Sequence, residues 1–261
     1  PIVITANTTD VACKGQATGE IDLTINGGTA PYGISWSPGL LTSNPLVGLP
    51  AGNYQAIVTD ANGCPQTSVV FVVDEPVDFL TATVDPLSIV LPDCNGNPTG
   101  AVTALASGGT GPYSFSWDIH PFDPFFTPQL TDIATGLAAG TYICTVTDFG
   151  SCVASSAQFT LNEPDPLTLV MSSTPTNCFG ENNGDATATP QGGTFPYTYN
   201  WSTAPLPSHN QQTTIDLPAG SYTVSVFDAN NCPAIGNVTV TEPDEIQATF
   251  TTTNVDCNGA A

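Results

Sequence analysis

The sequence has almost no positively charged side chains. Its 261 residues include one Lys and no Arg against 23 Asp and Glu residues, which gives a formal net charge of −22. A surface with one side-chain cation cannot displace counterions from phosphates, so nucleic-acid binding is excluded. The same shortage excludes a polybasic membrane patch and a phosphate clamp built from Arg or Lys.

Long hydrophobic runs are also absent. The longest obvious one, residues 69–73, falls far short of the roughly 18 residues of a membrane span, so we expect no span in this segment. The first residues show no basic region followed by an apolar stretch, so we expect that any secretion signal lies outside this sequence or has been removed. Charged residues make up only 9% and hydrophobic residues 40%, a balance that predicts a folded chain.

An internal repeat recurs about every 80 residues. Each copy carries, in order, Cys-x-Gly, a Gly-Gly-Thr, Pro-Tyr, a Trp four residues after that Tyr, Ala-Gly-x-Tyr, Asp-x-x-x-Cys and Glu-Pro. The Cys-x-Gly motifs begin at Cys13, Cys94, Cys178 and Cys257. We therefore expect repeats at residues 1–76, 77–164 and 165–243, with 244–261 opening a truncated fourth. This organisation indicates an excerpt from a longer tandem array.

Within a repeat, hydrophobic and polar residues alternate as they do in half-buried strands. Tyr32, Ile34 and Trp36, for example, share one strand face. The 24 Gly and 24 Pro of the chain supply turn signals between the strands. Six or seven such strands fit into each repeat. The prediction is an all-β chain of tandem immunoglobulin-like antiparallel β-sandwich domains, arranged as beads on a string. A barrel made from the same strands is the alternative.

Two cysteines at fixed motif positions in each repeat predict one disulfide within each domain. The expected pairs are Cys13–Cys64, Cys94–Cys152 and Cys178–Cys232. Cys257 has no partner in the truncated repeat. Disulfides of this kind predict an oxidising, extracellular compartment.

Cys144 stands outside this pattern. It aligns with Ala56 and Val224 on the inward face of a strand. We therefore expect a buried free thiol that fills core space, and not a reactive group.

The motif string closely resembles the SprB-type repeat of large Bacteroidetes cell-surface proteins, a group that includes gliding-motility adhesins. The resemblance covers three repeats and the start of a fourth. It implies type IX secretion, display at the cell surface, and use as tandem modules of adhesins or filaments. Two departures are small: Asp216 replaces the Gly that precedes Leu49 and Leu137, and Asn231 replaces Gly63.

The three tryptophans have two interpretations. As exposed platforms, Trp36, Trp117 and Trp201 would stack on sugar rings. Their alternation with Tyr on one strand face favours burial in the core.

Recurrent carboxylates occupy two kinds of position. Asp60, Asp148 and Asp228 precede Asn- or Gly-containing tight turns, where an Asp side chain accepts hydrogen bonds from the following backbone. Other acids gather where repeats meet, and a Ca²⁺ ion is the one candidate cofactor there, although solvated carboxylates are the favoured interpretation. The candidate ligands are Glu75, Asp78, Glu163, Asp165, Glu242 and Asp244.

The second repeat has a longer segment after its Trp, which contains His120, Phe122, Phe125 and Phe126 among prolines. Exposed aromatic residues indicate a contact surface, such as lateral packing between chains in a fibre. Folding of the segment back over its own sandwich is the alternative.

Catalysis finds no support, because His120 and His209 fall in different repeats and neither a nucleophile elbow nor a phosphate loop occurs. We expect a non-enzymatic structural or adhesive segment of a secreted cell-surface protein, forming a stalk or filament. Its partners would be neighbouring repeats and other copies in a fibre. The alternative is an array of polysaccharide-binding modules. The segments after the three tryptophans differ, which favours the scaffold.

Overall fold

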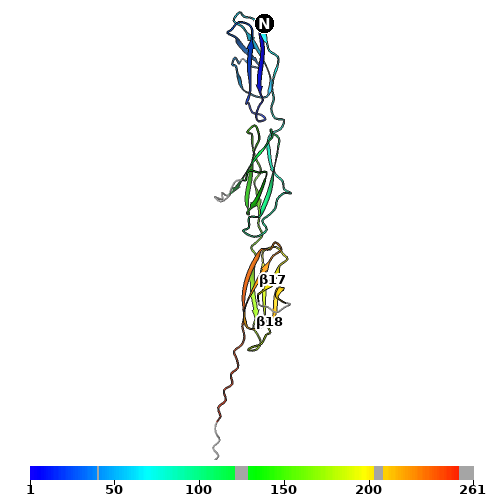
Figure 1. The fold of residues 1–261 in the computed structure, drawn as a ribbon, viewed down its shortest axis with the longest axis vertical. Helices are drawn as coiled ribbons and strands as arrows, with labels where there is room; N and C mark the ends of the chain where they lie inside the picture. The colour runs from blue at the N-terminus through cyan, green and yellow to red at the C-terminus, as the bar shows by residue number, and fades with distance from the viewer. Residues whose placement is uncertain (40, 121–128, 203–207, 253–261) are drawn as a thin grey trace, which may run out of the picture. The chain divides into compact units, whose positions relative to one another are not determined.

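The structure, a computed structural model, describes residues 1–39, 41–120, 129–202 and 208–252. Figure 1 shows the strands gathered into three clusters, one for each repeat of the sequence. All strand pairs are antiparallel. In the described part of the chain, a single 3-10 turn, η1 (Ser208–Asn210), is the only helical element.

The first repeat forms two sheets. One has the order β1-β2-β4, and in the other β5 pairs with β3, β6 and β7. The strands are β1 (Val3–Thr9), β2 (Gly19–Asn26), β3 (Gly33–Ser37), β4 (Leu46–Leu49), β5 (Gly52–Thr59), β6 (Pro65–Thr67) and β7 (Phe71–Val73).

The second repeat has the same arrangement, with the order β8-β9-β11 in one sheet and β12 paired with β10, β13 and β14 in the other. Its strands are β8 (Thr81–Val84), β9 (Gly100–Ser107), β10 (Ser114–His120), β11 (Ile133–Leu137), β12 (Gly140–Thr147), β13 (Val153–Ser155) and β14 (Phe159–Leu161).

The third repeat has sheets β15-β16-β18 and β17-β19-β20. Its strands are β15 (Thr168–Thr174), β16 (Gly184–Gln191), β17 (Thr198–Trp201), β18 (Thr213–Leu217), β19 (Gly220–Phe227) and β20 (Pro233–Val240). Two facing antiparallel sheets in each repeat confirm the predicted immunoglobulin-like sandwich, and not the barrel.

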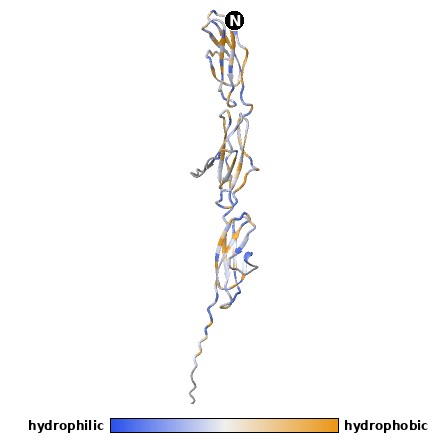
Figure 2. Ribbon diagram, viewed as in Figure 1, coloured by the Kyte–Doolittle hydropathy of each residue, from blue (hydrophilic) through white to orange (hydrophobic). Residues whose placement is uncertain are grey.

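Each repeat has its own hydrophobic core, built from strand residues that alternate between buried and exposed. Figure 2 shows hydrophobic positions recurring along the strands of each cluster. The largest buried side chains include Trp36, Trp117 and Tyr142. The three separate cores agree with three repeats, while the exact repeat boundaries stay a prediction.

The Ala-Gly-x-Tyr motif has a structural explanation. Each of its tyrosine hydroxyls donates a hydrogen bond of 2.8 or 2.9 Å to the carbonyl four residues earlier, the tyrosine corner of immunoglobulin-like folds. The three pairs are Tyr54 with Pro50, Tyr142 with Ala138, and Tyr222 with Pro218.

The chain divides into two compact units that do not follow the repeats. One unit consists of Pro1–Pro92 and Pro98–Asn162, and the other of Asp93–Asn97 and the chain from Glu163 onward. The short Asp93–Asn97 loop, which contains the Cys-x-Gly motif of the second repeat, therefore groups with the third repeat. A disulfide explains this grouping.

Candidate functional site

The disulfides join cysteines of successive repeats. Cys13 of the first repeat bonds to Cys152 of the second, and Cys94 of the second bonds to Cys232 of the third. The Cα–Cα separation is 5.6 Å in both. We call these bonds and their surroundings the first and the second junction. The predicted pairs within repeats are wrong, namely Cys13–Cys64, Cys94–Cys152 and Cys178–Cys232.

The strand register explains why the two cysteines of one repeat cannot meet. Cys13 follows β1 at the end of the sandwich where β7 finishes, because Val11 N–H donates to the Asp74 carbonyl (2.8 Å). Cys64 follows β5, which begins beside the end of β7 and runs to the opposite end of its sheet. Eight strand residues span about 25 Å, whereas a disulfide requires Cα atoms within about 7 Å.

Each Cys-x-Gly loop is held by the Glu of the Glu-Pro that closes the same repeat. The glycine N–H donates to a glutamate Oε2, and the glycine φ lies between +75° and +77°, a region that other residues rarely adopt. The pairs are Gly15–Glu75 (2.7 Å), Gly96–Glu163 (2.7 Å) and Gly180–Glu242 (2.8 Å). The two motifs recur together because they bond to one another.

The second cysteine of each repeat lies in a turn organised by the recurrent Asp. One carboxylate oxygen accepts the cysteine N–H, and the other accepts the Thr N–H of the Gly-Gly-Thr motif, at distances of 2.8 to 3.2 Å. The predicted turn role is confirmed for Asp60, Asp148 and Asp228. These hydrogen bonds, first of all the one from the Cys64 backbone, lower the pKa of the Asp60 carboxyl below 3.8.

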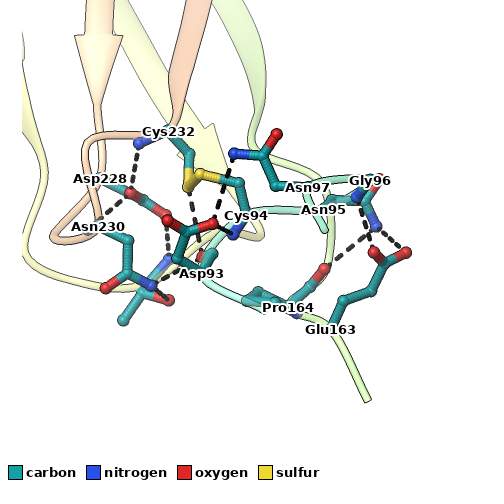
Figure 3. Close-up of a disulfide and its surroundings, with 11 residues drawn as sticks. Asp93, Cys94, Asn95, Gly96, Asn97, Glu163, Pro164, Asp228, Asn230 and Cys232 are labelled. Carbon is teal, nitrogen blue, oxygen red and sulfur yellow. Dashed lines mark hydrogen bonds between the residues drawn. A yellow bond between two sulfur atoms is a disulfide. The ribbon is translucent and has the colours of Figure 1, made fainter. Parts of the chain in front are cut away.

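The second junction adds side-chain hydrogen bonds to the disulfide (Figure 3). Asn230 Nδ2 donates to the Asp93 carbonyl oxygen (2.8 Å), so the turn contacts the residue before Cys94. On the other side, Asn95 Nδ2 donates to Glu163 Oε1 (2.9 Å). This junction is therefore polar on both sides of the sulfur atoms.

The first junction uses different groups at the same positions. Gly150 takes the position of Asn230, and a Cβ built on it would lie 2.6 Å from the Ala12 carbonyl oxygen. Lys14 takes the position of Asn95, with Nζ 5.4 Å from the centroid of the Phe79 ring. Close backbone approach thus replaces the Asn230 hydrogen bond, while Lys14 Nζ donates to the Val77 carbonyl and contacts the Phe79 ring where Asn95 donates to Glu163.

Three further cysteines are free in the described residues. Cys64 and Cys178, both expected in disulfides, are exposed thiols. Cys144 is buried among β-strand side chains, as predicted, and burial raises the pKa of its thiol to about 11. Cys144 is therefore protonated and unreactive at neutral pH.

The tryptophans belong to the core, which confirms the favoured interpretation. Trp36, Trp117 and Trp201 are at most 3% exposed, and each indole N–H donates to a backbone carbonyl at 2.9 or 3.0 Å. Their ring faces are therefore closed to a sugar.

The linker acids form no metal site among the described residues, where no group of three or more His, Cys, Asp or Glu is placed to hold an ion. The three glutamates accept backbone N–H groups through Oε2. The candidates Glu75, Asp78, Glu163, Asp165, Glu242 and Asp244 stay a prediction.

The aromatic segment of the second repeat lies mostly outside the described residues. His120 ends β10, while Phe122, Phe125 and Phe126 fall in the range 121–128 that is not described. A contact surface there stays a prediction. His209 lies in η1 of the third repeat.

The family model for the SprB repeat matches residues 5–41, 88–118 and 171–205. Each repeat of this chain contains a stretch that matches the SprB repeat. Each match runs past the first cysteine and the Trp and ends before the second cysteine, so the SprB model covers only one half of each junction. The predicted resemblance is confirmed, and the SprB repeats support an adhesin-type repeat segment.

Solved structures of tandem domains match the chain at low identity. One match is to three N-terminal domains of the Highly Immunogenic Outer Capsid protein of bacteriophage RB49, which are 11% identical to this chain. The TM-score is 0.41, and the match covers 94% of this chain and 100% of that chain. The N-terminal four Ig domains of Dscam1 isoform 6.9 are 15% identical, with a TM-score of 0.31 and coverages of 92% and 73%. Likeness at this level does not extend to function. No curated protein matches the chain.

Proposed function

We propose that the chain is a non-enzymatic, structural or adhesive segment of a large secreted cell-surface protein, in which SprB repeats are cross-linked to their neighbours. It forms an adhesin stalk or an extracellular filament. The sandwiches occupy residues 1–76, 77–164 and 165–243, with 244–261 opening the next repeat.

The observation that carries this proposal is the pair of disulfides between successive repeats. A protein that binds a ligand in each domain needs only folded domains, whereas these bonds connect one domain to the next. They add a second covalent connection beside the peptide linker at each junction. Such bonds persist in oxidising compartments, which supports a location outside the cell. Among the described residues, no helix has the length and hydrophobicity to cross a membrane.

The alternative of polysaccharide-binding modules loses its main support when the tryptophans are buried. Phe149 and Phe195 are exposed aromatic side chains, at 75% and 79%, but they occupy different positions in their repeats. A ligand read by every repeat would need an aromatic platform at equivalent positions.

Immunogold electron microscopy on intact cells tests the proposal. We expect antibodies against the chain to label stalks or filaments on the cell surface, and protease added to intact cells to remove the label. Labelling only after permeabilisation would contradict it. A glycan array probed with the purified chain tests the alternative, which predicts binding that is lost on substitution of exposed aromatic residues.

A further inference from the structure

Each junction consists of two halves from different repeats. One half is a Cys-x-Gly loop held by its Glu, and the other is the Asp turn with the second cysteine. The two junctions use four halves, and the described chain contains two more, one around Cys178 and one around Cys64. Both present exposed free thiols.

The half around Cys178 has the same internal structure as the bonded halves. Gly180 N–H donates to Glu242 (2.8 Å), and the Cys178 carbonyl accepts the N–H of Glu181 (3.2 Å). Cys13 and Cys94 accept the corresponding N–H groups at 3.0 and 3.1 Å. The loop is therefore already formed although its cysteine is unpaired.

The surface beside Cys178 also corresponds to a surface in the first junction. There, a hollow of about 410 Å³ is bounded by Ala12 and Pro76 of the first repeat and by Phe149 and Gly150 of the second. The third repeat has a hollow of about 360 Å³ lined by residues 177–179 and 243–246. In this lining Asn177 and Pro243 take the positions of Ala12 and Pro76, so the third repeat supplies this part of the wall that the first repeat gives to the first junction.

The half around Cys64 is equally preformed. Asp60 accepts the Cys64 N–H (3.0 Å), and Asn62 Nδ2 donates to Thr29 Oγ1 (2.9 Å). Asn230, at the equivalent position in the third repeat, contacts the equivalent threonine (3.3 Å) while it donates to the Asp93 carbonyl. Asn62 is thus oriented to donate to the residue that precedes an incoming Cys-x-Gly.

We propose that Cys64 and Cys178 are complementary docking halves for further SprB repeats. The Cys178 loop takes the Asp-turn half of another repeat, and the Cys64 turn takes a Cys-x-Gly half. The two thiols form one S–S bond and release two protons and two electrons to a small-molecule disulfide, which is reduced to two thiols. This inference depends on junction chemistry alone and goes beyond the adhesive role.

A second copy of the chain provides the test, because it carries both halves. Of Cys64, Cys178 and Cys257, one variant keeps only Cys64 (Cys178→Ser with Cys257→Ser), and the other keeps only Cys178 (Cys64→Ser with Cys257→Ser). Mixed in a glutathione redox buffer with about 0.15 M salt, which screens the two negative chains, the dimers are counted by non-reducing mass spectrometry.

We expect the Cys64–Cys178 heterodimer to exceed each homodimer at least tenfold, against twofold for random pairing. Asn62→Ala should lower this preference severalfold, whereas Asn53→Ala, an exposed asparagine of β5, should leave it unchanged. Peptide mapping checks that the Cys13–Cys152 and Cys94–Cys232 bonds are intact in every variant. A random ratio, or no heterodimer while both thiols still react with iodoacetamide, would overturn the proposal.

Discussion

The first and second junctions have the same Cα–Cα separation across the disulfide but different neighbours around it. In the first, Gly150 lets the turn backbone approach the Ala12 carbonyl. In the second, Asn230 fills that position and donates to the Asp93 carbonyl. The disulfide thus forms whether this position is a glycine or an asparagine whose side chain donates a hydrogen bond.

The features that do not differ are the two cysteines, the Glu–Gly hydrogen bond and the Asp turn. The Glu–Gly hydrogen bond and the Asp turn both use backbone N–H groups, which every residue except proline supplies. The junction is therefore specified by a few residues, and the side chains around it are free to vary from one repeat to the next.

Removal of a disulfide should have the largest effect. The Cys13–Cys152 bond closes a loop with a sequence separation of 139, worth about 5 kcal/mol on the chain-entropy model. Cys13→Ser with Cys152→Ser should lower the urea midpoint of unfolding, followed by tryptophan fluorescence, in the first two repeats. Cys64→Ser removes a thiol without a bond and should leave the midpoint unchanged; equal midpoints in the two variants would contradict the assignment.

Loss of the turn carboxylate should rank second and should be alike in both junctions. Asp148→Ala leaves two backbone N–H donors without an acceptor and Asp228→Ala leaves three, at a cost of about 2–4 kcal/mol in each case. Urea titration measures it. Asp22→Ala on the exposed face of β2 is the matched control and should cost little. A much smaller loss at one turn would show that the junctions differ there too.

The position that differs should respond differently in the two junctions. Gly150→Ala places a methyl group against the Ala12 carbonyl and should cost about 1–3 kcal/mol. Asn230→Ala removes one hydrogen bond and should cost about 1 kcal/mol. The readout is the glutathione ratio that half-reduces each disulfide. If Asn230→Ala were the more damaging change, the close approach at Gly150 would not matter.

The smallest effect concerns acid. The folded-state pKa of Asp60 lies below the unfolded value of 3.8, so its contribution to stability is complete above pH 3.8 and is lost as pH falls through the lower folded pKa. Asp60→Asn should remove this part of the acid dependence of the urea midpoint between pH 5 and 2. An unchanged acid profile in Asp60→Asn would assign the dependence to other carboxylates.

Local chemistry made much of the fold predictable. Alternation identified the strands and the buried face of Trp36, Trp117 and Trp201, and Asp before Asn or Gly identified the turns. Positive φ values at Asp216 and Asn231, 60° and 64°, agree with Gly48 and Gly136 at the first position and with Gly63 at the second. Each of these inferences depends on residues close together in the chain.

The disulfide partners could not be predicted in this way, because they depend on where each strand ends. β3 and β4 run in the same direction, since they pair with β5 and β2 respectively, so the segment between them must turn back without forming a strand. If every strand reversed the direction of the one before it, β5 would finish at the same end of the sandwich as β1. A count of strands alone therefore wrongly places Cys64 beside Cys13. One signal was available in the sequence, namely the Glu-Pro motif. It lies at the end of each repeat, and its Glu holds the Cys-x-Gly loop at that end.

The interlaced disulfides also set the maximum end-to-end length of the chain under load. Three segments, 13–94, 94–152 and 152–232, connect the two bonds in parallel, and the shortest has 152 − 94 = 58 residues. A load applied to the two ends therefore straightens only about 100 of the 261 residues, or about 350 Å instead of about 900 Å. Even with every sandwich unfolded, the oxidised chain would be a short tether whose full load falls on segment 94–152, and reduction would lengthen it more than twofold.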